Sequence, residues 1–337
     1  MINRRNFVVS AFNLALCKTA AGGLLASRKT VRPSAPPELL AMLAAAKNNP
    51  TGDLPRLLLA DWLENHGQCE RATFVRMQLE LARLPRGERG TEHYRQLDAV
   101  ETSLELRCRD SWLASLPDSL RHAVSFMRGL VQLTLHGAEE LEIVASTDVW
   151  PWVQWVWVER EPWEPTPLDL AFVRKVQASP LLADVRQLAW AFCHMDDNGA
   201  AVVAQSPQLT GLWQLELNGN IIGPRGAAAL AASPYLGGLH ELDFSCNGVG
   251  DEGAVALATS PLLRRLVRLC LTDNQIGDKG AAALTASPHF VNLAVLEVPN
   301  NEIGPNCMAA LTSFAHRRGV EVWVGDWYGD DVTKLVK

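Results

Sequence analysis

The sequence predicts an α/β solenoid with a curved parallel sheet inside and helices outside, preceded by a small α-helical domain. Three observations carry this prediction. Apolar positions in the second half of the chain recur every 27 residues, and an asparagine and a glycine recur in the same register. The region ahead of these repeats has apolar residues at helical spacing instead. A period of about 20–50 residues indicates stacked units, because one unit cannot bury its own apolar face whereas its neighbours can.

Each repeat opens with three apolar residues, which we interpret as the inward-facing residues of a short strand. In the first clean copy they are Leu212, Leu215 and Leu217, and the next copies open at Leu239, Leu266 and Leu293. Side chains alternate along a strand, so the intervening residues face the opposite, concave side.

An asparagine follows each strand, and its side chain can bond backbone groups that the turn leaves unpaired. We expect these side chains to form a structural ladder down the stack, at Cys193, Asn220, Asn247, Asn274 and Asn301. The glycine that follows, such as Gly223, suits a turn in which a Cβ atom would be unfavourable. Residues 226–230 then predict a short helix, which Ser233-Pro234 ends because proline cannot continue it.

The phrase L-x-x-L-x-L-x-x-N-x-I-G resembles the leucine-rich repeat, a family whose pattern also allows cysteine at the asparagine position. The helix half, G-x-x-G-A-x-A-L, is similar to the ribonuclease-inhibitor class of that family. The resemblance implies the solenoid fold, but fold alone does not imply function.

The array extends beyond the clean copies, which run from about 185 to 311. Alternating apolar residues at 130–135 and 153–158 indicate degenerate first repeats, and Val320–Val324 follows Leu293 by one period as a closing strand. We therefore expect about eight strands between residues 128 and 337, with atypical ends that cap the stack.

Residues 37–85 predict two or more helices and resemble the repeat-companion domain that accompanies leucine-rich repeats in planctomycete proteins. That family contributes architecture rather than a biochemical activity. The join after it is expected at Phe126–Leu130, and residues 86–127 are interpreted as a helical connector and cap. The residues that carry the resemblance are Arg56, Ala60–Glu64, Gly67, Arg71, Ala72, Phe74, Arg76 and Gln78.

Residues 1–36 are interpreted as a leader or disordered N-terminus. The scattered cysteines, seven in all and without a C-x-x-C pair, favour a reducing compartment, so we expect a cytoplasmic protein. The alternative is export, because Arg4-Arg5 and the apolar run Phe7–Cys17 resemble a twin-arginine signal. An exported envelope-associated binding protein is the corresponding alternative function.

Candidate chemistry is sparse. The cluster Cys193–Asn198 has metal-ligand residue types, but the repeat register accounts for them, so we expect no metal and no cofactor. The chain has no phosphate loop, H-E-x-x-H or G-x-S-x-G motif, and we assign no catalytic residues. Some leucine-rich repeat proteins of this class activate small GTPases, and Arg264 and Arg265 are the residues that such an activity would use.

The concave face is therefore the expected binding site, and the expected function is non-enzymatic protein binding. Two tryptophans at its N-terminal end and an acidic group in its middle suggest a protein partner with a basic surface. The net charge of −6 argues against nucleic-acid binding, no segment is long enough to span a bilayer, and we expect a monomer. The candidate binding residues are Trp155, Trp157, Gln187, Gln214, Glu216, Asn218, Glu241, Asp243 and Arg268.

Overall fold

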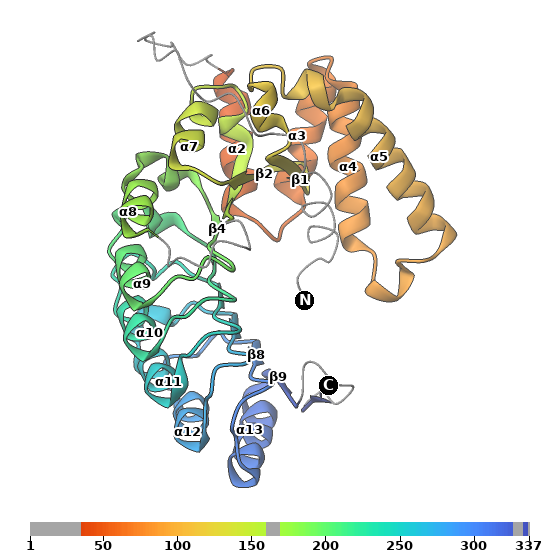
Figure 1. Cartoon of the computed structure of the whole chain (residues 1–337). Helices are drawn as coiled ribbons and strands as arrows, with labels where there is room; N and C mark the ends of the chain where they lie inside the picture. The colour runs from red at the N-terminus through yellow and green to blue at the C-terminus, as the bar shows by residue number, and fades with distance from the viewer. Residues whose placement is uncertain (1–34, 160–168, 326–332, 336–337) are drawn as a thin grey trace. The chain divides into compact units, whose positions relative to one another are not determined.

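A computed structural model describes residues 35–159, 169–325 and 333–335 (Figure 1). The expected leader lies outside the described residues except for Ala35 and Pro36. From residue 35 onward the described chain forms one compact unit.

The N-terminal part is helical, as the apolar spacing predicts. Proline at the first turn begins both α2 and α3, where its missing N–H costs no intrahelical bond. Gly67, with φ of +76°, turns the chain from α3 into α4. The Thr91 side chain accepts a hydrogen bond from the Tyr94 N–H at 3.2 Å and caps α5. The elements are α2 Pro37–Asn48, α3 Leu54–Asn65, α4 Cys69–Arg83, η1 Arg86–Glu88, α5 Glu92–Trp112 and α6 Asp118–Arg121.

One sheet runs through the rest of the described chain in sequential strand order. Strands β2 to β9 are parallel, and these are the eight strands that the sequence predicts. The strands are β1 Val124–Met127, β2 Leu130–Leu135, β3 Val153–Val158, β4 Gln187–Ala189, β5 Gln214–Glu216, β6 Glu241–Asp243, β7 Arg268–Cys270, β8 Val295–Glu297, β9 Glu321–Val324 and β10 Thr333–Lys334.

Two edge strands, β1 and β10, pair antiparallel to their neighbours and were not predicted. The expectation of a helical connector over 86–127 is therefore wrong at its end, where β1 forms a hairpin with β2. The turn of that hairpin uses Arg128 and Gly129 with φ of 49° and 83°. A Cβ atom on Gly129 would lie 2.8 Å from Val75 of α4, so close packing requires glycine there.

The register of the parallel strands follows the repeat period. Leu215, Leu242 and Leu269 are successive partners at intervals of 27 residues. The closing strand departs from this spacing, because Leu296 pairs with Val322, which is 322 − 296 = 26 residues later.

Helices α7–α13 lie on one face of the sheet, and the short η segments lead into several strands (Figure 1). Glycine lets neighbouring helices approach, since a Cβ on Gly226 would lie 3.1 Å from the Cβ of Ala200 in the adjacent helix. The helices are α7 Ala138–Ala145, α8 Leu170–Ala178, α9 Asp197–Ala204, α10 Pro224–Ala231, α11 Gly250–Thr259, α12 Asp278–Ala286 and α13 Pro305–Arg318. The 3₁₀ segments are η2 Trp150–Trp152, η3 Pro180–Asp184, η4 Pro207–Gly211 and η5 Pro261–Leu263.

The ladder asparagines bond the backbones of two repeats at once. Asn220 Oδ1 accepts hydrogen bonds from the N–H groups of Cys193 and Met195 at 3.0 and 2.9 Å. Its Nδ2 donates to the carbonyls of Trp190 and Leu217 at 2.6 and 2.8 Å. Asn247, Asn274 and Asn301 repeat this arrangement one unit later each time. Cys193, fully buried at the same position, donates its S–H to the Val158 carbonyl at 3.4 Å.

A second ladder consists of serines, which the sequence indicated only as helix-ending residues. The hydroxyl of Ser206 donates to the Gln177 carbonyl at 2.8 Å, and that of Ser233 donates to the Ala204 carbonyl at 2.6 Å. Ser260 and Ser287 make the equivalent bonds. Each hydroxyl thus satisfies a carbonyl at the C-terminal end of the helix one repeat earlier, which has no intrahelical partner.

A left-handed residue recurs with the same period just before the ladder position. Its φ is 55° at Phe192, 70° at Gly219, 57° at Cys246, 56° at Asp273 and 53° at Asn300. Only one of these five residues is glycine, so the conformation is imposed by the stack rather than by local preference.

The hydrophobic core is continuous from Leu39 in α2 to Val324 in β9. The helical region and the array therefore share one core, and this continuity fixes the helices against the first strands.

Candidate binding surface

The concave face is formed by two columns of side chains that run across the strands. The first column is Gln132, Trp155, Gln187, Gln214, Glu241, Arg268, Val295 and Glu321. The second column is Thr134, Trp157, Ala189, Glu216, Asp243, Cys270, Glu297 and Trp323. The pairing places every candidate strand residue beside the neighbours that the repeat register gives it.

The aromatic end of this face is only partly open. Trp155 is only 8% exposed, whereas Trp157 is half-buried, and their ring centroids lie 6.1 Å apart. Trp152 is buried under Arg71 of α4, whose guanidinium carbon lies 3.5 Å from the ring centroid. Trp213 stacks on His240 at 5.6 Å between ring centroids. Of these four tryptophans, Trp157 is the one on the concave face that offers substantial contact area.

A chain of amides links the aromatic end to the acidic middle. Gln187 Nε2 donates to Gln214 Oε1 at 2.6 Å, and Gln214 Nε2 donates to Glu216 Oε1 at 2.7 Å. Asn218, two residues beyond Glu216, is 2% exposed. Among the candidate binding residues, three buried polar atoms have no hydrogen-bond partner in the described chain: Trp155 Nε1, Gln187 Oε1 and Asn218 Oδ1. Such groups carry a desolvation cost that a bound ligand can offset.

The acidic middle combines three carboxylates on β5 and β6. Glu216 is the strand partner of Asp243, and Glu241 lies on the same strand as Asp243. Burial, followed by the charges of Asp243 and Glu241, raises the pKa of Glu216 from 4.5 to about 8. Burial also raises the pKa of Glu241 and of Asp243. These raised pKa values mean that deprotonation of the three carboxyl groups is disfavoured in the folded protein.

Arg268 pairs with a carboxylate outside the acidic middle. The strand pairing sets it beside Glu241, but its Nη2 forms an ion pair with Glu297 on β8 instead. Its Nε also lies 3.5 Å from Cys270 Sγ. Glu297 is buried, so pairing with Arg268 there replaces the water that its carboxylate loses, which favours this partner over the more exposed Glu241. In the described chain no arginine or lysine forms an ion pair with Glu216, Glu241 or Asp243.

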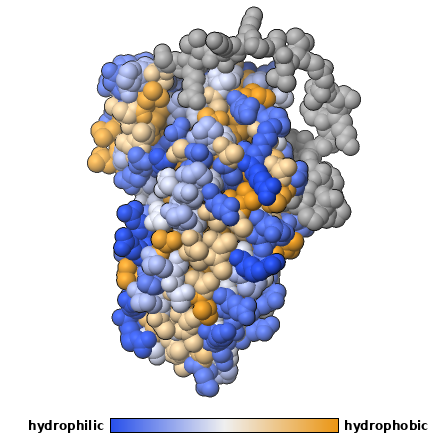
Figure 2. Space-filling model, turned by 90° about the vertical axis from the view of Figure 1, so that its left-hand side faces the viewer, coloured by the Kyte–Doolittle hydropathy of each residue, from blue (hydrophilic) through white to orange (hydrophobic). Residues whose placement is uncertain are grey.

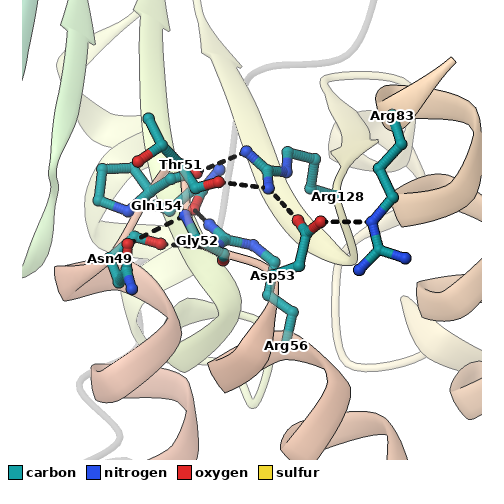
Figure 3. A network of polar contacts seen from close by, with 9 residues as sticks. Asn49, Thr51, Gly52, Asp53, Arg56, Arg83, Arg128 and Gln154 are labelled. Atoms are coloured by element: carbon teal, nitrogen blue, oxygen red, sulfur yellow. Dashed lines mark hydrogen bonds and ion pairs between the residues drawn. The ribbon is translucent and has the colours of Figure 1, made fainter.

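A second polar network joins the helical region to the array (Figure 3). Arg56, fully buried, donates to the carbonyls of Asn49 and Gly52 at 2.7 and 2.8 Å, and to Gln154 Oε1 of β3 at 3.1 Å. Burial lowers the pKa of Arg56 to about 10. Because a buried guanidinium is costly unless its donors are used, this arrangement is best explained as a structural joint.

Asp53 extends the same network on the solvent side. Its carboxylate forms ion pairs with Arg83 of α4, at 2.7 Å, and with Arg128 of the β1–β2 turn. Arg128 also donates to the carbonyls of Pro50 and Thr51 at 2.9 and 2.8 Å. Sequence reasoning missed Arg128 and Gln154 as members of this joint; the only signal was the expected join at Phe126–Leu130, which contains Arg128.

Other residues that carry the companion-domain resemblance also have structural partners. Gln78 accepts a hydrogen bond from the Gly129 N–H at 2.7 Å and donates to the Phe126 carbonyl at 3.1 Å. Arg76 bridges Asp61 and Glu64 at 2.6 and 2.7 Å on an exposed surface. These residues hold α3, α4 and the hairpin together, and none of them lines the concave face.

The metal-like cluster is occupied by structural contacts. Cys193 and Met195 are fully buried, and the Asp196 carboxylate caps α9 by accepting from the N–H groups of Asn198 and Gly199 at 3.0 and 2.9 Å. Asp197 Oδ1 accepts from the Gly223 and Gly226 N–H groups at 2.8 and 2.7 Å. The described residues contain no group of three or more His, Cys, Asp or Glu arranged to hold a metal.

The outer face offers no comparable arrangement. Figure 2 shows the left-hand side of Figure 1, where mildly hydrophobic patches lie between hydrophilic margins. Partly buried alanines such as Ala229, Ala256 and Ala283 pack against the core on these helices. Arg264 and Arg265 are exposed after η5, and neither forms an ion pair within the described chain. No helix in the described ranges is long and apolar enough to cross a bilayer.

The comparison with protein-family models agrees with the repeat pattern. The leucine-rich repeat family model matches residues 239–258 and 264–284. Among solved structures, an internalin from Listeria monocytogenes matches with a TM-score of 0.34 and 17% identity, over 57% of this chain and 53% of the internalin chain. The chain thus spans about half the length of that structure. No curated protein matches the sequence. The segments that the family model matches, residues 239–258 and 264–284, are therefore similar to leucine-rich repeats.

Proposed function

We propose that this chain is a non-enzymatic interaction module that binds a partner protein with a basic surface on its concave face. The observation that carries the proposal is the carboxylate group Glu216, Glu241 and Asp243, which has no cation paired to it in the described chain. A cationic partner surface would relieve the repulsion among these like charges and so gain affinity.

The neighbouring side chains support the same function. Trp157 offers apolar contact area at one end of the acidic group, and indole side chains often dominate interface energies. An open sheet provides no enclosed pocket of the kind that acid–base chemistry requires, which supports binding rather than catalysis.

The remaining architecture is assigned with this function. We infer that residues 37–85 are a planctomycete-type repeat-companion domain, that 86–127 connect it to the array at 128–337, and that the repeats belong to the ribonuclease-inhibitor-like class. The companion domain would cap the first strands through Arg56 and Gln78. We place the protein in the cytoplasm as a monomer that does not bind nucleic acid.

Capture followed by kinetics tests the proposal. The full chain is immobilised, a captured partner is identified, and its binding is measured at two salt concentrations. Glu216→Gln with Asp243→Asn should slow association and weaken its salt dependence, because complementary charge mainly accelerates encounter. Trp157→Ala should instead shorten the lifetime of the complex.

Matched controls remove exposed charge elsewhere. Glu252→Gln with Glu302→Gln deletes two exposed carboxylates outside the concave face and should leave both rates unchanged. If the concave-face variants bind as the wild type does, the interface lies elsewhere and the proposal fails.

A further inference from the structure

The middle of the concave face offers mostly hydrogen-bond acceptors. The Nε2 groups of Gln187 and Gln214 are already used in the amide chain. What remains without a partner are Gln187 Oε1 and Asn218 Oδ1, on side chains that are 8% and 2% exposed, and the one donor Trp155 Nε1. The Glu216 carboxylate beside them is partly exposed and is also an acceptor, so it calls for a ligand group that consists of donors.

The register leaves a place for such a group between an aromatic ring and a carboxylate. Trp157 and Glu216 flank Ala189 in the second column, one strand away on either side. Neighbouring strands lie about 4.8 Å apart, so roughly 10 Å separates the two backbone positions. Ala189 itself is fully buried, so such a group would lie above it, against Trp157 and Glu216, which are both partly exposed.

We propose that the partner's anchor is a single arginine side chain seated between Trp157 and Glu216, an inference that rests on the proposed function. A guanidinium has five N–H donors and no acceptor, which matches the acceptors of this face. Its plane can stack on the Trp157 indole while its edge bonds both oxygens of Glu216. A lysine ammonium carries the same charge but has no plane to stack and no fork to pair with a carboxylate.

Protonation of Glu216 gives the anchor a pH signature. Burial and the charges of Asp243 and Glu241 raise the pKa of Glu216 to about 8, so the free protein holds a proton there at neutral pH. The groups around it are Gln214 on its own strand, Glu241 and Asp243 on β6, Gln187 and Ala189 on β4, and Trp157 on β3. Arginine remains charged throughout, so binding should release this proton and tighten as pH rises towards 8.

Three synthetic peptides on the full chain test the anchor. They are acetylated, amidated Gly-Ser-X-Ser-Gly with arginine, lysine or citrulline at X, the last having the shape of arginine without its charge. The probe is the indole N–H resonance of Trp157 in protein with ¹⁵N-labelled tryptophan, assigned from its loss in Trp157→Leu. The arginine peptide should shift this resonance saturably and more strongly at pH 8 than at pH 6, lysine should bind roughly tenfold more weakly, and citrulline should not bind.

Variants complete the test. Glu216→Gln should weaken the arginine peptide roughly tenfold and abolish its pH dependence, whereas Glu252→Gln, on an exposed helix surface, should bind as the wild type does. Equal shifts from the arginine and lysine peptides, or unchanged binding by Glu216→Gln, overturn the anchor. If the arginine peptide fails while partner capture still depends on Glu216 and Asp243, the anchor is wrong and the proposed function stands. If both dependences are absent, both proposals fall.

Discussion

At the residue scale, the ladder asparagines show how one side chain can serve two repeats. Asn274 is fully buried, its Oδ1 accepts from the Val249 N–H at 3.2 Å, and its Nδ2 donates to the carbonyls of Phe244 and Thr272 at 2.9 and 3.0 Å. These partners lie in turns, where no strand neighbour can satisfy them. An amide with both donor and acceptor groups is therefore needed at this position.

Replacing this asparagine should destabilise the array. Asn274→Ala leaves buried backbone groups unpaired, and we expect the free energy of unfolding to fall by roughly 1–3 kcal/mol. Asn306 is exposed on α13, and Asn306→Ala should be near neutral. Thermal or urea denaturation of both variants measures the difference, and equal effects would contradict the structural role of the ladder.

The acidic cluster predicts a pH-dependent stability. The folded-state pKa of Glu216, about 8, exceeds its ordinary value of 4.5, so the folded chain binds more protons than the unfolded chain between these values. Stability therefore falls as pH rises through this window. Glu216→Gln removes the effect: its unfolding free energy should match the wild type at pH 4.5 and exceed it by roughly 1–3 kcal/mol at pH 8.5.

Urea denaturation at the two pH values measures this crossover. Glu252→Gln, which removes an exposed carboxylate, should track the wild type at both. A Glu216→Gln variant whose advantage is the same at pH 4.5 and 8.5 would show that Glu216 titrates normally.

Single residues also show where sequence reasoning reaches its limit. The positions of Glu216, Asp243 and Arg268 on the concave face followed from the period, because side-chain direction alternates along a strand. The ion pair of Arg268 with Glu297 rather than Glu241 did not follow from the period. Both neighbouring strands carry a carboxylate, and the packing of the side chains decides between them. The burial of Trp155 did not follow either, because the period predicts the direction of a side chain and not its exposed fraction.

At the element scale, aspartates at the starts of the outer helices cap the next helix in the stack rather than only their own. Asp251 Oδ1 of α11 accepts from the N–H groups of Gly277 and Gly280 at the start of α12, both at 2.8 Å. Asp197 of α9 bonds the start of α10 in the same way. The first N–H groups of a helix have no intrahelical partner, so a carboxylate there is also favoured by the helix dipole.

Helix α11 lacks this cap, because α10 has Pro224 at the position that Asp197 has in α9 and Asp251 has in α11. The following Gly250 then has φ of +59°, whereas Gly223 and Gly277 have φ of −95° and −97°. Its N–H bonds the Asn274 carbonyl at 2.9 Å instead. The sequence period located these helices, but a cap that crosses between repeats could not be inferred from any one of them.

The inter-repeat cap can be tested by removal and by addition. Asp251→Ala should lower the free energy of unfolding by about 1–2 kcal/mol, and Asp251→Asn, which keeps an acceptor, by much less. Pro224→Asp should raise it by about 0.5–1 kcal/mol by supplying the missing cap to α11. Urea denaturation measures all three.

Glu252→Ala, at the neighbouring exposed position, is the control and should change little. Equal losses in Asp251→Ala and Glu252→Ala would mean that the cap contributes nothing. A loss in Pro224→Asp would show that the proline conformation is worth more than the cap.

At the scale of the whole molecule, the helical region and the array are joined by contacts that lie far apart in sequence. Arg56 of α3 reaches Gln154 of β3 across 98 residues, and Arg128 of the hairpin reaches Asp53. The period predicted the array in detail because the same residue types recur at equivalent positions in successive repeats. The contact between Arg56 and Gln154 occurs only once in the described chain, so no recurring pattern in the sequence indicated it.

Breaking this joint should uncouple the two regions. Arg56→Met removes a buried guanidinium and leaves the carbonyls of Asn49 and Gly52 without donors, so we expect a loss of roughly 2–5 kcal/mol. Arg83→Met, which removes a half-exposed ion pair to Asp53, should cost less than about 1 kcal/mol.

Hydrogen exchange of intact protein then locates the loss. Because the core is continuous, wild-type residues 37–83 should be protected together with the array, whereas in Arg56→Met they should exchange first while residues 239–298 stay protected. Uniform loss of protection across both regions would show that Arg56 stabilises the whole core rather than the joint.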